Sequence, residues 1–564
     1  REAKPTWWKV FSCADLTEQE LIDDIECIGG LRRLAVHPPT GRGPLPTWVC
    51  EYPEQEFKTQ PDRKPTRADT AASVTLVEVD EENCRLTLKP SKRALEPDAT
   101  RLSLGPPAPI DTKALRAAIV RFAAAYARGE DRYQALRALL RKDAPHLRGH
   151  TLGAPVVRQL PATLEEITAA VAALDHSYLF LQGPPGAGKT YIGSHVIVEL
   201  MRAGKRVAIS PTSHKAIPNL LAGIEDAADA RHFRFSGVKK ADRKDADKQF
   251  QGRIIQNVFS NDEALGGPTD LVAGTAWLFA DAEADEQFDY LFIDEAGQIS
   301  LGHLVAMGVA ARNIVLLGDQ MQLSQPIQGV HPGRTGESIL EYLLDSHATV
   351  PPDRGIFLAN TWRMHPDVCA FISDAVYDGQ LKSAPGLERQ ALVLGRGHRA
   401  ALRNTGVRFW PVEHDACAQK SEEEATEICA LYDSLLGQQW RDRHGELQDI
   451  TAEDIVVVAP YNMQVNLLRQ RLPAGARIGT VDKFQGQEAA VVLVSMATSS
   501  GEYLPRDIEF LYSKNRINVA LSRAKCLAIL VASPRLLDIR CRTPAQIELV
   551  NTLCWAVEYS RAAD

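Results

Sequence analysis

Short aliphatic runs separated by helix-length intervals restrict the fold of this 564-residue chain more than any other feature. Strands that are apolar at every position are buried on both faces, which is typical of parallel sheets covered by helices. There are enough runs for two sheets, so we predict an α/β protein with two doubly wound parallel sheets. The expected strands are Tyr178–Leu181, Val207–Ser210, Tyr290–Ile293, Ile314–Leu317, Ile455–Val458, Val491–Val494 and Ala528–Ala532.

The composition is that of an ordinary globular chain and excludes several classes of protein. Hydrophobic residues make up 45% and charged residues 24%, and no apolar run approaches the ~20 residues that cross a bilayer. The net charge of −8 gives no general support for nucleic-acid binding, which would need local basic surfaces. The ten cysteines lack CxxC spacing, so we expect reduced thiols in a cytoplasmic protein. Because the chain begins at Arg1 and not Met, we expect a fragment of a longer protein.

The region before the aliphatic runs predicts smaller modules. A helix is expected over Thr17–Ile28, and Ser73–Val79 with Cys84–Leu88 predict a hairpin within a small β-barrel, or else a two-stranded flap. Apolar residues then recur at helical spacing from Leu115 to Tyr126, which predicts a helical stalk. The expected organisation is 1–45 as a helical or linker segment, 46–108 as the β-barrel module, 109–155 as the stalk, 156–350 as the first α/β domain and 351–564 as the second.

A phosphate-binding loop follows the first expected strand. Gly183–Thr190 reads Gly-Pro-Pro-Gly-Ala-Gly-Lys-Thr and fits G-x-x-x-x-G-K-[ST] between a strand and a helix. The glycines allow backbone N–H groups to close around a triphosphate, and the helix N-terminus adds a favourable field. Lys189 would contact the β- and γ-phosphates and Thr190 would bind Mg²⁺. We predict an ATP site formed by Gly183, Pro184, Pro185, Gly186, Ala187, Gly188, Lys189, Thr190 and Tyr191.

Two adjacent acids end the strand near Tyr290–Ile293. Asp294 is expected to hold Mg²⁺, and Glu295 is expected to polarise the attacking water as a general base. A phosphate loop alone fits kinases, GTPases, transporters and helicases. The pair of acids narrows that choice to hydrolysis of a nucleoside triphosphate.

Further motifs follow in order, and together they resemble those of superfamily 1 helicases. They are Asp294–Gln298, Gly318–Leu323, Thr361–Pro366, Thr480–Glu488 and Asn515–Ala524. The resemblance implies two RecA-like motor domains that bind ATP and Mg²⁺ between them. It implies that Gln322 senses the γ-phosphate, that Arg363 meets it from the second domain, and that Arg523 is an arginine finger. Cations of one domain facing a triphosphate on the other would draw the domains together until phosphate leaves.

Within that superfamily, Arg363–Pro366 and Phe484–Glu488 resemble the group that contains the nonsense-decay RNA helicase and the replication and repair nuclease–helicase. Thr212–Ile217 and the module order resemble the latter, and also the motor of bacterial RecB-like nuclease–helicase fusions. This implies a 5′→3′ translocase and helicase on single-stranded DNA, with a nuclease domain N-terminal to this chain. An RNA helicase, or an ATP-gated clamp that does not unwind, remains an alternative.

The expected adenine-reading glutamine is missing from its usual place. The family often carries a Gln about 17 residues before the phosphate loop, where this chain has Leu164–Ile167, and Gln159 lies further upstream. Trp362 replaces a family tyrosine and would stack on the base or pack in the core. Glu488 is the remaining residue assigned to the nucleotide.

Candidate nucleic-acid contacts lie just after expected strands in both domains. Hydroxyl, amide and Lys groups at strand ends suit phosphate contacts without base recognition. A basic run within Arg231–Arg253 would line a channel or form a solvated face. The candidate contacts are Thr212, Ser213, His214, Lys215, Gly274, Thr275, Pro460, Tyr461, Asn462, Thr480 and Lys483.

Overall fold

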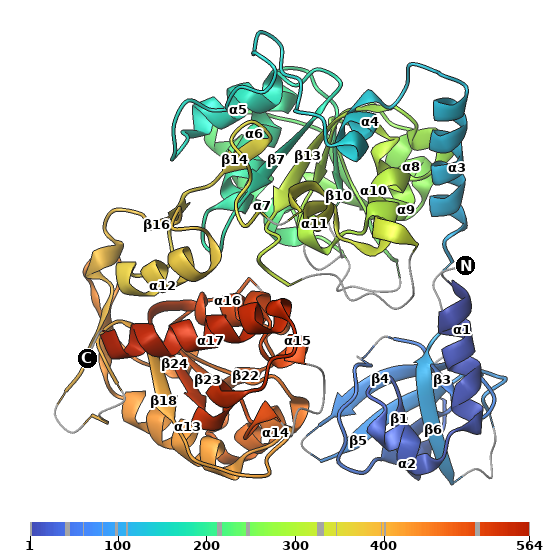
Figure 1. Ribbon diagram of the computed structural model, residues 1–564. Helices are drawn as coiled ribbons and strands as arrows, with labels where there is room; N and C mark the ends of the chain where they lie inside the picture. Colours follow the sequence, from blue (N-terminus) through green and yellow to red (C-terminus); the bar gives the residue numbers. More distant parts are fainter. Residues whose placement is uncertain are drawn as a thin grey trace.

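The computed structural model contains an N-terminal β module and two α/β domains (Figure 1). All structural statements refer to the residues it describes: 3–39, 45–59, 61, 63–81, 83–95, 100–108, 111–210, 217–243, 249–323, 332–345, 347–395, 398–399, 402–484, 486–501 and 508–562. None of the helices in this part of the chain combines the length and apolar character that a bilayer crossing requires. All ten cysteines are free thiols.

The N-terminal module is a six-stranded antiparallel sheet that nearly closes into a barrel. Its order is β3-β6-β1-β2-β5-β4, and a bridge between Thr66 and Ser73 brings the two edge strands together. Trp48, Leu76 and Leu86 are among the side chains that fill its interior. The strands are β1 (Ile28–His37), β2 (Thr47–Glu51), β3 (Pro65–Arg67), β4 (Val74–Asp80), β5 (Arg85–Pro90) and β6 (Arg101–Pro107).

The predicted hairpin is confirmed as the antiparallel pair β4–β5, and the six strands replace the alternative of a two-stranded flap. The prediction of a helical or linker segment over 1–45 is wrong for residues 28–37, which form β1. The helix predicted over Thr17–Ile28 is shorter in the structure, as α2 (Glu18–Asp23). Gly29 and Gly30 interrupt the strand pattern, but a Cβ at Gly29 would lie 2.6 Å from the Ile22 backbone nitrogen. The close packing of α2 on β1 therefore requires glycine at position 29, and this glycine weakens the strand pattern in the sequence.

The predicted stalk forms two helices that pack on the first α/β domain. They are α3 (Lys113–Ala127) and α4 (Gln134–Arg141), with α1 (Ala3–Ser12) lying earlier in the chain. α3 packs against α10 (Leu301–Gly308), and α4 packs against the sheet strands that flank the phosphate loop. Leu115, Leu136 and Leu139 belong to the same apolar core as one face of the first sheet.

The first α/β domain is an eight-stranded parallel sheet of order β10-β9-β11-β8-β12-β13-β7-β14. α5 (Leu164–Ala172), α6 (Lys189–Arg202) and α7 (Ile217–Ala230) pack on one face. The other face carries α3, α4, α10, α8 (Asn261–Leu265), α9 (Ala276–Phe279) and α11 (Ile339–Leu344). The strands are β7 (Tyr178–Gln182), β8 (Val207–Ser210), β9 (Gly237–Lys240), β10 (Ile255–Val258), β11 (Leu271–Ala273), β12 (Phe288–Ile293), β13 (Ala311–Gly318) and β14 (Gly355–Phe357).

The second α/β domain is a five-stranded parallel sheet of order β18-β24-β23-β21-β22. Its strands are β18 (Gly406–Pro411), β21 (Ile455–Val458), β22 (Arg477–Gly479), β23 (Ala489–Ser495) and β24 (Ala524–Ala532). Its helices are α12 (Pro366–Val376), α13 (Glu422–Leu435), α14 (Asn462–Arg471), α15 (Ile508–Leu511), α16 (Lys514–Leu521) and α17 (Pro544–Ala562). Smaller pairings join β15 (Asn360–Thr361) to β16 (Lys382–Ser383), and β19 (Gln439–Arg441) to β17 (Ala391–Val393) and β20 (Leu447–Asp449).

The two predicted parallel sheets are confirmed, but the boundary predicted at 350 is wrong. β14 lies beyond it and pairs in parallel with β7, so the first sheet takes a strand from the expected second domain. A Cβ at Gly355 would lie 2.4 Å from the Phe180 carbonyl oxygen, so the strand can approach this closely because it starts with glycine. The chain therefore leaves the first sheet immediately before Thr361–Pro366.

Candidate nucleotide site and nucleic-acid surface

The phosphate loop connects the carboxyl end of β7 to the first turn of α6. Gly186 and Gly188 have φ of +74° and +80°, which L side chains rarely adopt, so the loop needs glycine at both places. The Lys189 ammonium donates to the Gly183 carbonyl oxygen at 2.6 Å, and the Gly183 N–H donates to Gly318 on β13. The loop is thus held on two neighbouring strands, with its lysine folded over it.

The two acids follow β12 at the same edge of the sheet. Burial, with the adjacent Glu295 charge, raises the pKa of Asp294 to about 7, and Lys189 opposes that shift. Glu295 has a left-handed backbone with φ of +52°, and its N–H donates to Asp294 Oδ1 at 2.9 Å. Such a backbone costs of order 1–3 kcal/mol and persists where surrounding contacts fix it, often at functional sites. Here it turns the chain sharply at the expected general base.

Gln322 lies in a buried polar cluster that joins the two domains. Its amide donates to Asp319 Oδ2 at 3.0 Å, and the Tyr377 hydroxyl donates to the same oxygen at 2.6 Å. From α16, the Asn518 amide donates to the Met321 carbonyl at 2.8 Å and the Asn515 amide to the Gln322 carbonyl at 2.6 Å. A movement of one domain relative to the other would therefore change the contacts around Gln322.

Thr361 and Trp362 touch the phosphate loop directly. The Trp362 N–H donates to the Gly186 carbonyl at 2.9 Å, and the Thr361 hydroxyl donates to the Pro185 carbonyl at 2.9 Å. A Cβ at Gly186 would lie 2.6 Å from both the Arg363 Cβ and the Thr361 hydroxyl. The expected arginine of the second domain thus lies against the loop.

Arg363 is held by an acid of its own domain. Its Nε donates to Glu488 Oε2 at 2.8 Å and its Nη1 to the Ser522 carbonyl at 3.1 Å, while Lys525 Nζ lies 3.1 Å from Glu488 Oε1. Glu488, Arg523 and Lys525 lie at the amino ends of β23 and β24. The second sheet therefore presents its amino edge to the carboxyl edge of the first.

Arg523 is 3% exposed, and its Nε and Nη2 have no hydrogen-bond partner among the described residues. Its Nη1 donates to the Gln487 carbonyl at 3.3 Å. Burial and the neighbouring Arg363 charge lower the pKa of Arg523, and the Glu295 carboxylate opposes the shift. A buried cation with two open donors beside Glu295 is suited to an oxyanion such as a phosphate.

Two aromatic side chains flank the loop on its outer side. Trp362 is 55% exposed and Tyr191 is 60% exposed, and the Tyr191 ring lies 4.0 Å from the His195 ring, centroid to centroid. The alternative that Trp362 packs in the core is therefore wrong. The exposed Trp362 ring can stack on a base, whereas the Tyr191 ring already contacts His195 and Gln159 lies in the exposed stretch before α5.

The oxygen donors suit magnesium. Thr190 supplies a hydroxyl at the loop and Asp294 a carboxylate from the adjacent strand end, and Mg²⁺ prefers such oxygen ligands together with phosphate oxygens and water. The described residues contain no cluster of three or more His, Cys, Asp or Glu side chains that would hold a metal without a nucleotide.

Comparison with known proteins matches both domains. Residues 167–327 and 335–535 each match a family model described as "AAA domain". The Arabidopsis thaliana protein "DNA replication ATP-dependent helicase/nuclease JHS1" is 25% identical over 395 residues, 66% of this chain and 28% of the relative. The Schizosaccharomyces pombe "DNA polymerase alpha-associated DNA helicase A" is 26% identical over 403 residues, 61% of this chain and 59% of the relative.

Over the matched region the chain is similar to superfamily 1 helicases. The two domain matches and the names of these relatives support the predicted resemblance to ATP-hydrolysing helicases. The chain spans 28% and 59% of the lengths of these two relatives. A solved arterivirus nonstructural protein 10 helicase with DNA is 14% identical, with a TM-score of 0.40 over 92% of this chain and 80% of that chain. A likeness of that size carries no functional conclusion.

In the first α/β domain, a cavity of about 500 Å³ opens at the carboxyl ends of β9, β10 and β11. Thr275, which follows Gly274 after β11, lines it together with Lys240, Arg243 and Trp277. The predicted contacts Thr212, Ser213, His214 and Lys215 lie outside the described residues.

The basic residues within Arg231–Arg253 do not form one continuous surface. Lys239 is buried in β9, Arg231 pairs with Glu199, and Arg253 lies within 2.8 Å of Asp226 and Asp229. Of its expected channel residues, Lys240 and Arg243 line the cavity, Arg234 is exposed, and Lys244 and Lys248 lie outside the described residues.

In the second α/β domain, Pro460, Asn462 and Thr480 are half-buried and Lys483 is exposed, all near the carboxyl ends of β21 and β22. Tyr461 is 0% exposed, with its ring 5.6 Å from that of Phe510. Its side chain is therefore not available to nucleic acid as predicted, because it anchors the start of α14 in the core.

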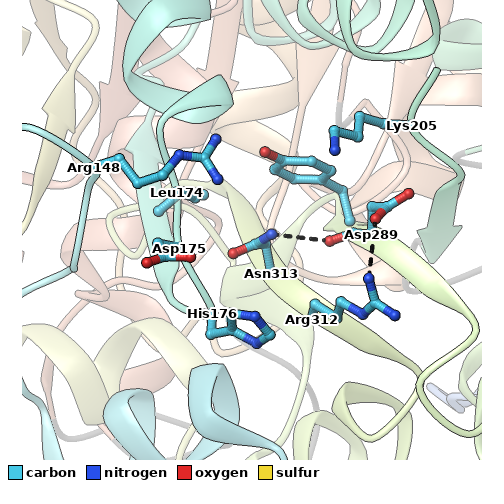
Figure 2. Close-up of a pocket in the computed structure, with 9 residues that line it drawn as sticks. Arg148, Leu174, Asp175, His176, Lys205, Asp289, Arg312 and Asn313 are labelled. Carbon is cyan, nitrogen blue, oxygen red and sulfur yellow. Dashed lines mark hydrogen bonds and ion pairs between the residues drawn. The ribbon is translucent and has the colours of Figure 1, made fainter. Parts of the chain in front are cut away.

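A second cavity, of about 100 Å³, lies at the opposite edge of the first sheet (Figure 2). His176, Lys205 and Arg312 line it where their strands begin, and Arg312 pairs with Asp289 at 3.7 Å. The phosphate loop is at the other end of these strands. This cavity is therefore separate from the nucleotide site.

Proposed function

We propose that the protein is an ATP-dependent translocase and helicase that moves 5′→3′ on single-stranded DNA. The observation that carries this proposal is that Arg363 of the second domain lies against the phosphate loop of the first, with Arg523 buried close to Arg363 and Glu295. ATP bound by Gly183–Tyr191 would give both cations a phosphate partner, and its loss would leave Arg523 buried with open donors.

The residues divide the chemistry between the domains. Lys189 holds the β- and γ-phosphates, Glu295 orients and deprotonates the attacking water, and Arg523 stabilises charge on the transferred phosphoryl group. Mg²⁺ held by Thr190 and Asp294 would neutralise charge between the β- and γ-phosphates. Gln322, bonded through Asp319 and Tyr377 to the second domain, transmits the state of the γ-phosphate.

Strand movement requires that both domains grip the polymer. Thr275 with Lys240 and Arg243 supplies a polar and cationic surface on the first domain, and Asn462, Thr480 and Lys483 supply one on the second. The relatives named above as DNA helicases favour DNA, and the nuclease named in one of them supports a nuclease partner domain N-terminal to this chain, as part of DNA repair or processing.

RNA is the second candidate substrate, because an Arabidopsis "Regulator of nonsense transcripts 1 homolog" is 24% identical over 442 residues, 68% of this chain and 33% of the relative. ATP hydrolysis should be measured without polymer, with single-stranded DNA and with single-stranded RNA. Strong stimulation by DNA supports the proposal, whereas stimulation by RNA alone favours the decay-type activity. Stimulation without displacement of a strand from a tailed duplex would identify a clamp.

A further inference from the structure

The N-terminal barrel lies against the helix that carries a predicted nucleic-acid contact. The Asn462 amide, at the start of α14, donates to the Phe57 carbonyl oxygen of the barrel at 3.4 Å. At the other end of α14, Arg469 Nη1 lies 2.9 Å from Glu81 Oε2 in the turn between β4 and β5. Figure 1 shows this end of the barrel facing α14.

Asn462 and Arg469 share one face of α14, because seven residues are close to two helical turns. Lys483 follows β22 in the same domain, and its ammonium donates to the Ile478 carbonyl oxygen at 3.4 Å. Seven residues rise about 10 Å along a helix, so Asn462 and Arg469 mark two points of one face, and Arg469 Nη1 also donates to Asn466 Oδ1 at 3.3 Å.

Glu81 is the anion that contacts Arg469 in the structure. A carboxylate and a phosphodiester are both monoanions with two acceptor oxygens, so a site that holds one can accept the other. We propose that Arg469 binds a backbone phosphate of the single strand, that Asn462 and Lys483 contact the strand elsewhere along its path, and that Glu81 occupies the phosphate site at Arg469 until the strand displaces it. This inference rests on the proposed function.

The contact is weak enough to be exchanged. The side chains of Arg469 and Glu81 are 23% and 25% exposed, and partly exposed ion pairs of this kind contribute little to stability. A polynucleotide brings several phosphates and releases counterions, which favours its binding at such a surface. Strand binding would therefore separate the barrel from α14 at Glu81 and open the surface that includes Asn462.

The test is the affinity of the full chain for a fluorescent single-stranded oligothymidylate at low salt. Glu81→Gln should tighten binding about fivefold, since it removes the competing charge and keeps the shape. Glu78→Gln is the matched control. Glu78 is an exposed acid on β4, so its substitution removes the same charge from the barrel. Equal affinity of the two variants would overturn the inference.

Arg469→Gln gives an independent measurement. It should weaken binding and lower the slope of log affinity against log salt by about 0.7, the value for one phosphate contact on a single strand. Arg471→Gln on the same helix, where Arg471 pairs with Glu422, is the control. In the Arg469→Gln background, Glu81→Gln should give no further tightening, and a full fivefold gain there would contradict the proposal.

The outcomes separate this inference from the proposed function. If the wild-type chain binds the strand and the variants equal their controls, the phosphate site at Arg469 is wrong and the helicase proposal stands. If the wild-type chain binds neither DNA nor RNA, the proposed function fails, and this inference fails with it.

Discussion

Arg363 and Glu488 form an ion pair, 2.8 Å from Nε to Oε2, one residue beyond the Trp362 N–H that bonds the phosphate loop. Glu488 and the Ser522 carbonyl hold the guanidinium close to the loop. A γ-phosphate would compete with Glu488 for Arg363. The pair therefore orients the Arg363 guanidinium close to the phosphate loop.

Glu488→Gln tests this ion pair through stability. Burial alone would raise the pKa of Glu488, but the charges of Arg363 and Lys525 outweigh it and lower the pKa below the usual 4.5. The carboxylate therefore stabilises the fold above its unfolded pKa, and that contribution is lost as the pH falls through the lower folded-state pKa. Glu488 is 43% exposed, so we expect the variant to lose about 1 kcal/mol at pH 7. Urea unfolding at pH 7 and pH 4 should show this gap shrinking in acid; a gap that widens would contradict the assignment.

Lys189→Ala should abolish ATP hydrolysis, because it removes the charge that holds the β- and γ-phosphates. A steady-state phosphate-release assay measures this. Lys205→Ala is the control, since Lys205 lies at the opposite edge of the same sheet and should leave the rate unchanged. Equal loss in both variants would point to a general effect on the domain.

Glu295→Gln should keep ATP binding and lose turnover by about 10²–10⁴-fold, the usual size of a general-base contribution. Binding of a fluorescent ATP analogue and single-turnover hydrolysis separate the two effects. Exposed Glu283→Gln provides the matched change of charge. Wild-type hydrolysis in Glu295→Gln would remove this residue from the base role.

Trp362→Ala should raise the KM for ATP about tenfold, since stacking of an exposed ring on a base is worth about 1–1.5 kcal/mol. Trp362→Phe should restore most of the affinity, because it keeps a stacking face. The KM and kcat of both variants, measured with ATP and GTP, check this. An unchanged KM in the alanine variant would show that the base binds elsewhere.

Much of the architecture could be predicted because its signals are local. The phosphate loop and the acids after β12 are short segments whose residue types follow from phosphate chemistry. The aliphatic runs at β7, β8, β12 and β13 are readable because strands buried on both faces need no polar alternation. Trp362 could be assigned to the nucleotide site because it lies within the contiguous motif Thr361–Pro366.

Features that depend on distant contacts were missed. Gly29 allows α2 to pack closely on β1, but in the sequence this glycine looks like an interruption of the strand. Tyr461 reads as a polar strand-end residue, but the core around Phe510 buries it. Asn515, which fixes the Gln322 backbone, and Glu81, which meets Arg469, come from segments whose meeting only the folded chain determines.

The central claim is that ATP lies between the two domains and that Arg523 completes its site from the second. The most direct test is Arg523→Ala, with hydrolysis rate and affinity for a non-hydrolysable ATP analogue measured on one preparation. We predict a rate lower by about 10³–10⁵-fold, as for other arginine fingers, with analogue affinity largely retained. A wild-type rate, or a loss of binding that accounts for all of the lost activity, would contradict the account.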